Sequence, residues 1–475
     1  MRGRAAGAVT HDMFDRRGNP AGLLRYTSGM AAREPEVDVA VIGGGPGGST
    51  AACRLARAGR RVVLFERDRF PRFHIGESLL ASVNDVFDEI GASDLVRACR
   101  FPPKWGATFL TADGSIERFA DFAVSPEVRA PQTWQVPRAE FDDVLLRHAG
   151  ASGVDVREEH RVLDVVFDPS GVTVTVRSPA GETFTVRAGA VVDASGRVGL
   201  LARKLGLRVD EPRLANIAIF SHYSGVPRRD GRRAGDIRIV ARHDLGWFWF
   251  IPISDELMSV GVVLPRAAFD ALPRMSHEAL LEHTLAQTPA AAALMHAARR
   301  EWPVRVEKDF SFGARAYAGD RWLLVGDAGS FLDPVFSTGV AIALESGVEA
   351  ARALDRGLES GDLSARAFAT FNRRQRQRYL SFRRFVLAFY TRGFRDLFFQ
   401  PRPSALVFRA VVTSLAGYWE PSAATRAWQT FFFLLARVQE RIPFASRIPE
   451  VGTGRVAQDA VTSAVSPSPS TLPRA

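Results

Sequence analysis

The stretch Val37-Asp-Val-Ala-Val-Ile-Gly-Gly-Gly-Pro-Gly-Gly-Ser49 decides the fold of this chain. Its first six residues form an apolar run suited to a buried parallel strand. The glycines that follow have the GxGxxG spacing, and the residues from Ser49 to Ala58 favour a helix. Val62–Phe65 is the next apolar run, and Glu66 follows it directly. Strand, glycine loop, helix, strand and acid together predict the dinucleotide-binding unit of a doubly wound α/β fold.

Each part of this unit has a chemical reason. Glycines let the backbone approach a pyrophosphate at a helix N-terminus, and an acid after the second strand binds ribose hydroxyls. The residues that we expect to contact the nucleotide are Gly43, Gly45, Pro46, Gly48, Ser49, Glu66 and Arg67.

Composition limits the other functions. The chain has 475 residues, of which 46% are hydrophobic and 24% charged, so two or three globular lobes are expected. The net charge of +10 comes from basic residues spread over the whole chain, which disfavours nucleic-acid binding. Cys53 and Cys99 are the only cysteines, so we expect no disulfide framework, no metal site and a reducing cytoplasm. The chain has no apolar run long enough for a spanning helix.

Lysine is rare in this sequence. Of the 62 Lys and Arg residues only three are lysines, at positions 104, 204 and 308. Arginine stays protonated and cannot act as an amine, whereas a buried lysine can. Each lysine therefore calls for a chemical explanation; we expect Lys204 and Lys308 to be solvated.

Two later segments indicate the cofactor. Ala190–Gly196 and Trp322–Asp327 are apolar runs that end in turns of small residues, and both resemble flavin-contacting motifs of the para-hydroxybenzoate-hydroxylase-like flavoproteins. This resemblance implies bound FAD, with Asp327 at its ribityl chain and Arg138 beside it. The segment Phe70–Leu80 resembles the loop after the second strand in the flavin-dependent halogenases, which implies that Ser78 also lies near the flavin. Because the chain carries one nucleotide fingerprint, we expect a separate flavin reductase to supply FADH2.

Three further segments narrow the class. Trp247-Phe-Trp-Phe-Ile-Pro252, Arg100-Phe-Pro-Pro-Lys-Trp-Gly-Ala-Thr-Phe109 and Asp333-Pro-Val-Phe-Ser-Thr-Gly339 resemble the motifs of the flavin-dependent halogenases. The resemblance extends over roughly residues 37–395. It implies that FADH2, O2 and chloride or bromide produce a hypohalous acid.

The resemblance also assigns roles to residues. Thr338 and Gly339 become the halide contacts, since the backbone N–H groups at a helix start form an anion site. Alternatively, these groups serve only the flavin ring.

Trp247, Trp249 and Pro252 become a wall between flavin and substrate, although aromatic residues also simply fill cores. Lys104 becomes the amine that receives the oxidant, and burial among Phe101, Trp105 and Phe109 would promote loss of its proton.

One position departs from the tryptophan-specific branch of the family. Those enzymes carry a glutamate directly before Ser-Thr-Gly, and this chain has Phe336. The pattern is that of enzymes acting on phenols, pyrroles and carrier-protein-bound substrates, so free tryptophan is not expected. The substrate's general base is left unassigned. His74 is expected to serve packing or hydrogen bonding.

The organisation that we predict is an α/β flavoprotein with an inserted antiparallel sheet and a C-terminal helical region. The segments are a disordered extension (1–36, with Met1 or Met30 as the start), an FAD-binding domain (37–360) with the substrate sheet inserted at about 101–135 and 210–318, a helical domain (361–452) and a disordered tail (453–475). The helical region is expected near 368–395, 404–418 and 427–441. Phe431–Leu435 either contacts a membrane surface or carrier protein, or packs as a lid.

Two other functions fit the same fold. The first is a flavin monooxygenase or a geranylgeranyl-reductase-like FAD oxidoreductase, which needs neither Lys104 nor the Trp wall. The second is a non-catalytic flavoprotein that docks a partner through its C-terminal helices. Dependence on halide distinguishes both from a halogenase.

Overall fold

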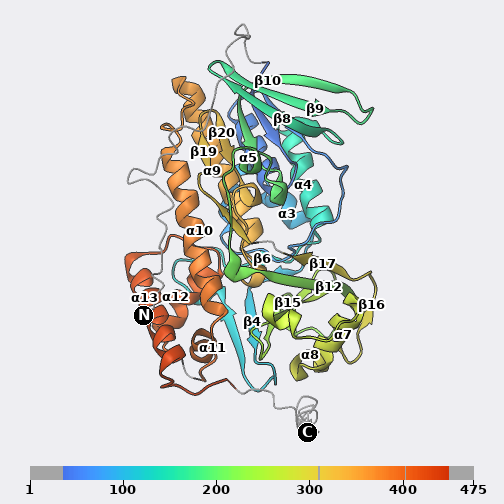
Figure 1. Ribbon diagram of the computed structural model, residues 1–475, viewed down its shortest axis with the longest axis vertical. Coiled ribbons are helices and arrows are strands. Elements are labelled where there is room, and N and C mark those ends of the chain that lie inside the picture. Colours follow the sequence, from blue (N-terminus) through green and yellow to red (C-terminus); the bar gives the residue numbers. More distant parts are fainter. Residues whose placement is uncertain (1–35, 309–310, 402, 449–475) are drawn as a thin grey trace, which may run out of the picture.

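The computed structural model describes residues 36–308, 311–401 and 403–448; the predicted disordered termini lie almost entirely outside these ranges. Two lobes are visible in Figure 1, each built on an eight-stranded sheet, with the long helix α10 (Ala369–Phe389) running beside both. The mixed α/β class expected from the sequence is confirmed.

The first lobe contains the nucleotide unit. Its sheet runs in the order β19 (Ala318–Gly319), β20 (Trp322–Leu324), β10 (Thr183–Asp193), β1 (Val37–Ile42), β2 (Val62–Phe65) and β7 (Asp155–Arg157), with the hairpin β8 (Arg161–Asp168) and β9 (Gly171–Arg177) attached to β10. The strands from β20 to β7 are parallel. Strands β1 and β2 have the predicted bounds, because their apolar residues are buried between layers of side chains.

Helices cover this sheet. Helix α1 (Pro46–Arg57) packs against α9 (Thr338–Ser360) and α4 (Arg138–Ala151), while α2 (Val83–Ile90) contacts α9 and α3 (Ser93–Ala98). Helix α1 begins at Pro46, three residues before the predicted Ser49, since proline suits the first helical turn.

The second lobe contains the inserted sheet, in the order β16 (Arg299–Arg300), β12 (Asn216–Ser224), β15 (Met258–Pro265), β14 (Trp247–Pro252), β13 (Ile237–Ala241), β4 (Gly106–Leu110) and β5 (Glu117–Asp121), with β17 (Arg305–Lys308) beside β12. All these pairs are antiparallel except β13 with β4, which is parallel. Helices α7 (His277–Ala286) and α8 (Pro289–Met295) contribute side chains to the apolar core on one face of the sheet.

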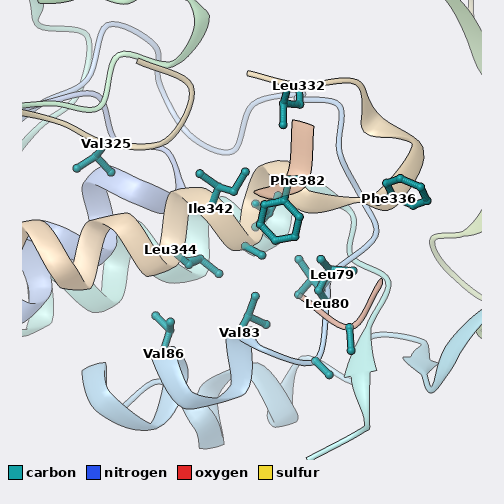
Figure 2. Close-up of a cluster of buried hydrophobic side chains, with 14 of the residues drawn as sticks. Leu79, Leu80, Val83, Val86, Val325, Leu332, Phe336, Ile342, Leu344 and Phe382 are labelled. Atoms are coloured by element: carbon teal, nitrogen blue, oxygen red, sulfur yellow. The ribbon is translucent and has the colours of Figure 1, made fainter. Parts of the chain in front are cut away.

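Small elements join the lobes. The two-stranded pair β3 (Pro103–Lys104) and β6 (Thr133–Trp134) sets Lys104 opposite Thr133. The adjacent segment of Leu79 and Leu80 is anchored in a buried cluster with α2 and α9, and Figure 2 shows both leucines beside Val83 and close to Phe382. The backbone around Lys104 is therefore held by the main hydrophobic core.

The C-terminal region is helical as predicted, but the segment 368–395 is divided. Helix α10 ends at Phe389, and α11 (Arg392–Phe398) restarts after Thr391, whose hydroxyl accepts the Phe394 N–H as an N-cap. Helices α12 (Ala405–Leu415) and α13 (Ala423–Arg441) complete the region.

Helix α13 has two apolar faces. Phe432 and Phe433 are buried, whereas Phe431 and Leu434 are 45% and 58% exposed. The helix therefore packs against α11 and α12 on one side and leaves apolar surface on the other. None of the helices in the described part of the chain combines the length and apolarity needed to cross a bilayer.

Candidate active site

A cavity of about 720 Å³ lies between the two lobes. From the first lobe its lining includes Gly43, Gly45, Pro46, Glu66, Arg67, Arg138, Asp327 and Gly339, and from the second lobe Phe220, Ile237, Trp247, Trp249 and Ile251. Most of the predicted nucleotide contacts thus meet the two tryptophans around one cavity.

The glycine loop divides into residues that border the cavity and residues that hold the loop. A Cβ on Gly45 would meet no atom closer than 3.6 Å, so the backbone there is open to a ligand. A Cβ on Gly48 would lie 1.9 Å from the Gly43 carbonyl oxygen, and Gly48 is outside the cavity lining. Ser49 is also outside it, and its hydroxyl donates to the Gly44 carbonyl over 2.8 Å. Gly48 and Ser49 therefore support the loop, where we had expected direct contact.

Glu66 also holds this loop. Its Oε2 accepts the Gly44 N–H at 2.6 Å, and its Oε1 accepts the Asp68 N–H at 2.9 Å. The carboxylate still lines the cavity. Its position at the end of β2 is the one from which an acid reaches a ribose.

Arg138 fixes the loop that follows β2. It forms a bidentate pair with Asp142, at 2.7 and 2.8 Å, and donates to the Ile75 carbonyl over 2.8 Å. Arg72 donates to the same carboxylate at 2.9 Å. The neighbouring His74 bonds to the Ile75 carbonyl oxygen through Nδ1, and burial lowers its pKa to about 4. His74 thus has the hydrogen-bonding role expected for it.

Asp327 lies in the cavity lining after β20. Burial raises its pKa to about 6, against the opposing charges of Arg197 and Arg138. A half-buried carboxyl facing a cavity suits a hydroxyl-bearing ligand, because hydroxyl donors would stabilise its charged form. Together with the open backbone at Gly45, this arrangement fits a dinucleotide with a polyol segment.

The predicted halide loop reaches the cavity through its backbone turn. Ser337 has a left-handed φ of 57° and precedes Thr338, the first residue of α9. Ser337 and Gly339 line the cavity, whereas Thr338 is buried outside the lining. The long helix α9 directs its N-terminus, the positive end of its dipole, to this place.

The aromatic wall comes from the alternation of β14. Trp247, Trp249 and Ile251 line the cavity, and Phe248 and Phe250 pack in the core on the opposite face. Pro252 does not line the cavity, so Ile251 takes the place expected for it. The strand period of two explains the change, since residue 252 shares parity with 248 and 250.

A buried hydrogen-bond chain holds Trp247. Its Nε1 donates to the Tyr390 hydroxyl at 2.8 Å, and that hydroxyl donates to Asp333 Oδ2 at 2.7 Å. Asn216 donates to the same oxygen at 2.7 Å. Burial raises the pKa of Asp333 to about 6 and that of Tyr390 well above its usual value. The chain links the C-terminal helices to both the wall and the halide loop.

Lys104 is 1% exposed. Its Nζ donates to Ser78 Oγ at 2.8 Å and to the Leu79 carbonyl at 2.7 Å, and it lies 5.3 Å from the centre of the Phe122 ring. Burial lowers the pKa of the amine to about 7, while the charge of Asp236 opposes this shift. Lys104 itself does not line the cavity, but Ser78 does, so a single side chain connects them. Lys204 and Lys308 are exposed, as predicted.

Sequence reasoning missed Asp236 and Tyr390. Asp236 directly precedes the apolar strand β13 and is 3% exposed, and a lone acid beside an apolar run was the only available signal. Tyr390 lies at the break between α10 and α11, which the sequence pattern did not reveal. Within the described ranges, no group of three or more His, Cys, Asp or Glu side chains is arranged to hold a metal ion.

Comparisons with known proteins agree with this geometry. The family described as FAD binding domain matches residues 36–379. The chain is 32% identical over 376 residues to the 1H-pyrrole-2-carbonyl-[peptidyl-carrier protein] chlorinase of Pseudomonas fluorescens, covering 75% of this chain and 84% of that protein. It is 35% identical over 362 residues to the tryptophan 2-halogenase of Chondromyces crocatus, covering 74% and 67%. The crystal structure of CmlS, a flavin-dependent halogenase, superposes with a TM-score of 0.71 at 34% identity, covering 84% and 71%.

The fold and the cavity define an FAD-dependent enzyme. The chain belongs to the flavin-dependent halogenases.

Proposed function

We propose that this enzyme halogenates an electron-rich aromatic substrate through the amine of Lys104. The observation that carries the proposal is the buried position of this rare lysine, hydrogen-bonded to a serine that faces the cavity. An amine with a pKa near 7 holds a proton at neutral pH and can also release it, which suits a group that activates hypohalous acid by proton donation during halogen transfer.

The cofactor site follows from the lining residues. The loop at Gly45 would hold the pyrophosphate, Glu66 and Arg67 the adenosine side, and Asp327 the polyol. Bound and reduced FAD would supply two electrons to dioxygen and the halide two more, so that one oxygen atom leaves as water and the other forms hypohalous acid. The α9 N-terminus at Gly339 would bind the halide through backbone N–H groups. Trp247 and Trp249 would keep the organic substrate away from the flavin.

The substrate class is drawn from the relatives and from position 336. The Pseudomonas fluorescens relative is named for a pyrrole bound to a carrier protein, which supports a carrier-bound or small phenolic or pyrrolic substrate. At the position of the glutamate in the tryptophan-specific branch, this chain has Phe336, whose ring packs edge-on against Phe385 and Phe389. Because the Chondromyces crocatus relative is named as a tryptophan 2-halogenase, tryptophan is included among the substrates to be tested.

The partners are a flavin reductase and, for a tethered substrate, a carrier protein. The single glycine fingerprint supports a separate reductase. The exposed apolar side chains of α13, among them Trp428, Phe431 and Leu434, offer a docking surface for the carrier. Binding of this surface to anionic vesicles would instead indicate peripheral membrane contact.

Cys53 and Cys99 are free thiols, which supports a reducing cytoplasm.

The decisive experiment supplies the protein with FAD, a flavin reductase, NADH, air and bromide, with monochlorodimedone as the halogen acceptor. We expect loss of the acceptor's absorbance only when bromide is present. A monooxygenase or reductase would consume NADH and oxygen at a rate that ignores bromide, and that result would refute the proposal. Phenol, pyrrole and tryptophan are then offered in place of monochlorodimedone.

A further inference from the structure

An aromatic ring that gains a halogen must lose a proton, and the sequence motifs supply no base for it. The position that carries a glutamate in the tryptophan-specific branch holds Phe336, which is buried among aromatic rings. The base must therefore come from another part of the structure, near Lys104.

Asp236 lies near Lys104: each charge shifts the pKa of the other group, although the two side chains form no ion pair or hydrogen bond in the part of the chain that the structure describes. It follows Gly235, where an added Cβ would lie 1.9 Å from the carbonyl oxygen of Pro103. The backbone before Asp236 thus touches the backbone before Lys104. The Trp105 amide also stabilises the charged form of the Asp236 carboxyl. On the cavity side, Ile237 and Ser78 line the wall behind which these two groups lie.

The electrostatic surroundings leave one oxygen of Asp236 available. Arg233 donates through Nε to Oδ2 at 3.3 Å, and this arginine is shared with Glu117 on β5 at 2.9 Å. The other oxygen, Oδ1, is buried and has no hydrogen-bond partner among the described residues. The charged groups facing Asp236 are therefore Arg233 and Lys104. Burial raises the pKa of the carboxyl to about 6, and both cations oppose this shift.

A second unpaired acceptor lies next to it. Gln135 is fully buried, and its Nε2 donates to the Gly235 carbonyl at 2.8 Å. Its Oε1 has no partner within the part of the chain that the structure describes. Two buried acceptors without donors are costly unless a water molecule or a ligand supplies the hydrogens. A phenol O–H or a pyrrole N–H is such a donor.

We propose that Asp236 is the catalytic base that takes the proton from the halogenated carbon and returns it to Lys104, and that Gln135 receives the hydrogen bond of the substrate's O–H or N–H group. This inference rests on the proposed function, in which hypohalous acid reaches Lys104. The ring carbon bonds to the halogen as the oxygen–halogen bond breaks, and the departing hydroxide takes a proton from the Lys104 ammonium and leaves as water. The carbon then loses its hydrogen as a proton to Asp236. Transfer of this proton to the neutral amine restores both side chains.

The first test needs no substrate. Selective labelling of lysine with ¹³C at Cε gives three signals, since the chain has three lysines. We expect the Lys104 signal to titrate near pH 7 and its midpoint to fall in Asp236→Asn, because the lost negative charge had favoured the ammonium. An unchanged midpoint would mean that the two groups are not coupled and would overturn the inference.

The second test uses resorcinol and ring-deuterated resorcinol. In the wild type, we expect carbon deprotonation to be fast and the rates with the two substrates to be equal. Asp236→Asn should lower resorcinol halogenation about 100-fold, reveal a primary isotope effect and remove the decline in rate below about pH 6 that protonation of Asp236 causes in the wild type. The matched control is Asp121→Asn. Asp121 lies on the nearby strand β5 and forms an ion pair with Arg232, and this variant should keep the wild-type rate.

The outcomes separate the two proposals. Monochlorodimedone traps oxidant in solution, so Asp236→Asn should still consume it in a bromide-dependent way, which also shows that the variant folds and binds FAD. A wild type that makes no oxidant would refute the proposed function itself. An Asp236→Asn enzyme that halogenates resorcinol at the wild-type rate, or loses rate with no isotope effect, would refute only the role of Asp236.

Discussion

The two ends of the active site are built in different ways. At the nucleotide end, the glycine loop and the acid that holds it come from one continuous segment, residues 37–66, and this segment uses mainly backbone geometry and one carboxylate. The amine end gathers Ser78, Lys104, Phe122, Gln135 and Asp236 from segments far apart in sequence. A local motif fixes the first end, whereas the second exists only once both lobes have formed. Damage to the first end should therefore stop all chemistry, and damage to the second should stop only the transfer to substrate.

The largest effect should come from Lys104→Ala. We expect the variant to keep FAD and bromide-dependent oxidation of monochlorodimedone but to lose roughly 1,000-fold in halogenation of an organic substrate, because no ammonium group activates the hypohalous acid by giving a proton to its departing oxygen. Product formation by mass spectrometry, together with oxygen consumption, measures both steps. Lys204→Ala and Lys308→Ala are the matched controls. Full activity in Lys104→Arg would remove the amine from the mechanism.

Gly48→Ala tests the other end. A Cβ there would overlap the Gly43 carbonyl, so the loop must shift, at a cost of about 3 kcal/mol. We expect FAD affinity to fall about 100-fold, and oxidant production and halogenation to fall together. Gly150→Ala is the control, because its Cβ would make an ordinary 3.7 Å contact on α4. Tight FAD binding in Gly48→Ala would show that the loop is less constrained than the structure indicates.

The buried amine should also leave its mark on stability. Folding lowers the pKa of Lys104 from its usual value of 10.5 to about 7, so above pH 7 the folded state binds fewer protons than the unfolded state. The free energy of unfolding should therefore rise by about 2 kcal/mol between pH 7 and pH 9 through this group. Urea unfolding of the wild type and of Lys104→Met at both pH values measures the contribution of Lys104 to the pH dependence of the free energy of unfolding. Equal pH dependence in the two proteins would show that the amine keeps its ordinary pKa.

A smaller effect is expected where the C-terminal helices reach the wall. Tyr390→Phe removes one hydrogen bond to Trp247 and one to Asp333, worth about 1 kcal/mol in positioning, so organic halogenation should fall about fivefold. More of the oxidant should escape to monochlorodimedone, as a less fixed wall would allow. Tyr223→Phe is the control, because the buried Tyr223 hydroxyl has no partner among the described residues. Unchanged partitioning would mean that Tyr390 has no influence on the wall.

Much of the fold was predictable because its signals are local. Strands β1 and β2 have the predicted bounds, since a buried parallel strand requires a continuous apolar run and the glycine loop limits its length. The face of β14 was also predictable in principle. Alternation alone places Ile251 on the same face of β14 as the two tryptophans and Pro252 on the opposite face. Pro252 was assigned to the wall because it belongs to the motif that resembles the halogenases.

Other features carried no local signal. The break after Phe389 depends on Thr391 capping the next helix, in a segment whose aromatic and basic residues all suit a continuous helix. Thr338 and Gly48 were expected to touch ligands because their motifs do; in the structure both are buried outside the cavity lining, and Gly48 packs against the Gly43 carbonyl.

The sequence by itself determined the nucleotide unit, the class of cofactor and the rarity of lysine that drew attention to Lys104, because backbone propensity, glycine geometry and residue rarity can all be read along the chain. Only the tertiary structure decided that Lys104 is buried, that Ser78 connects it to the cavity, and that Asp236 and Gln135 lie beside it with unpaired oxygens. The physical reason is that burial and electrostatic coupling depend on distances between segments, and those distances are set when the two sheets pack around the cavity.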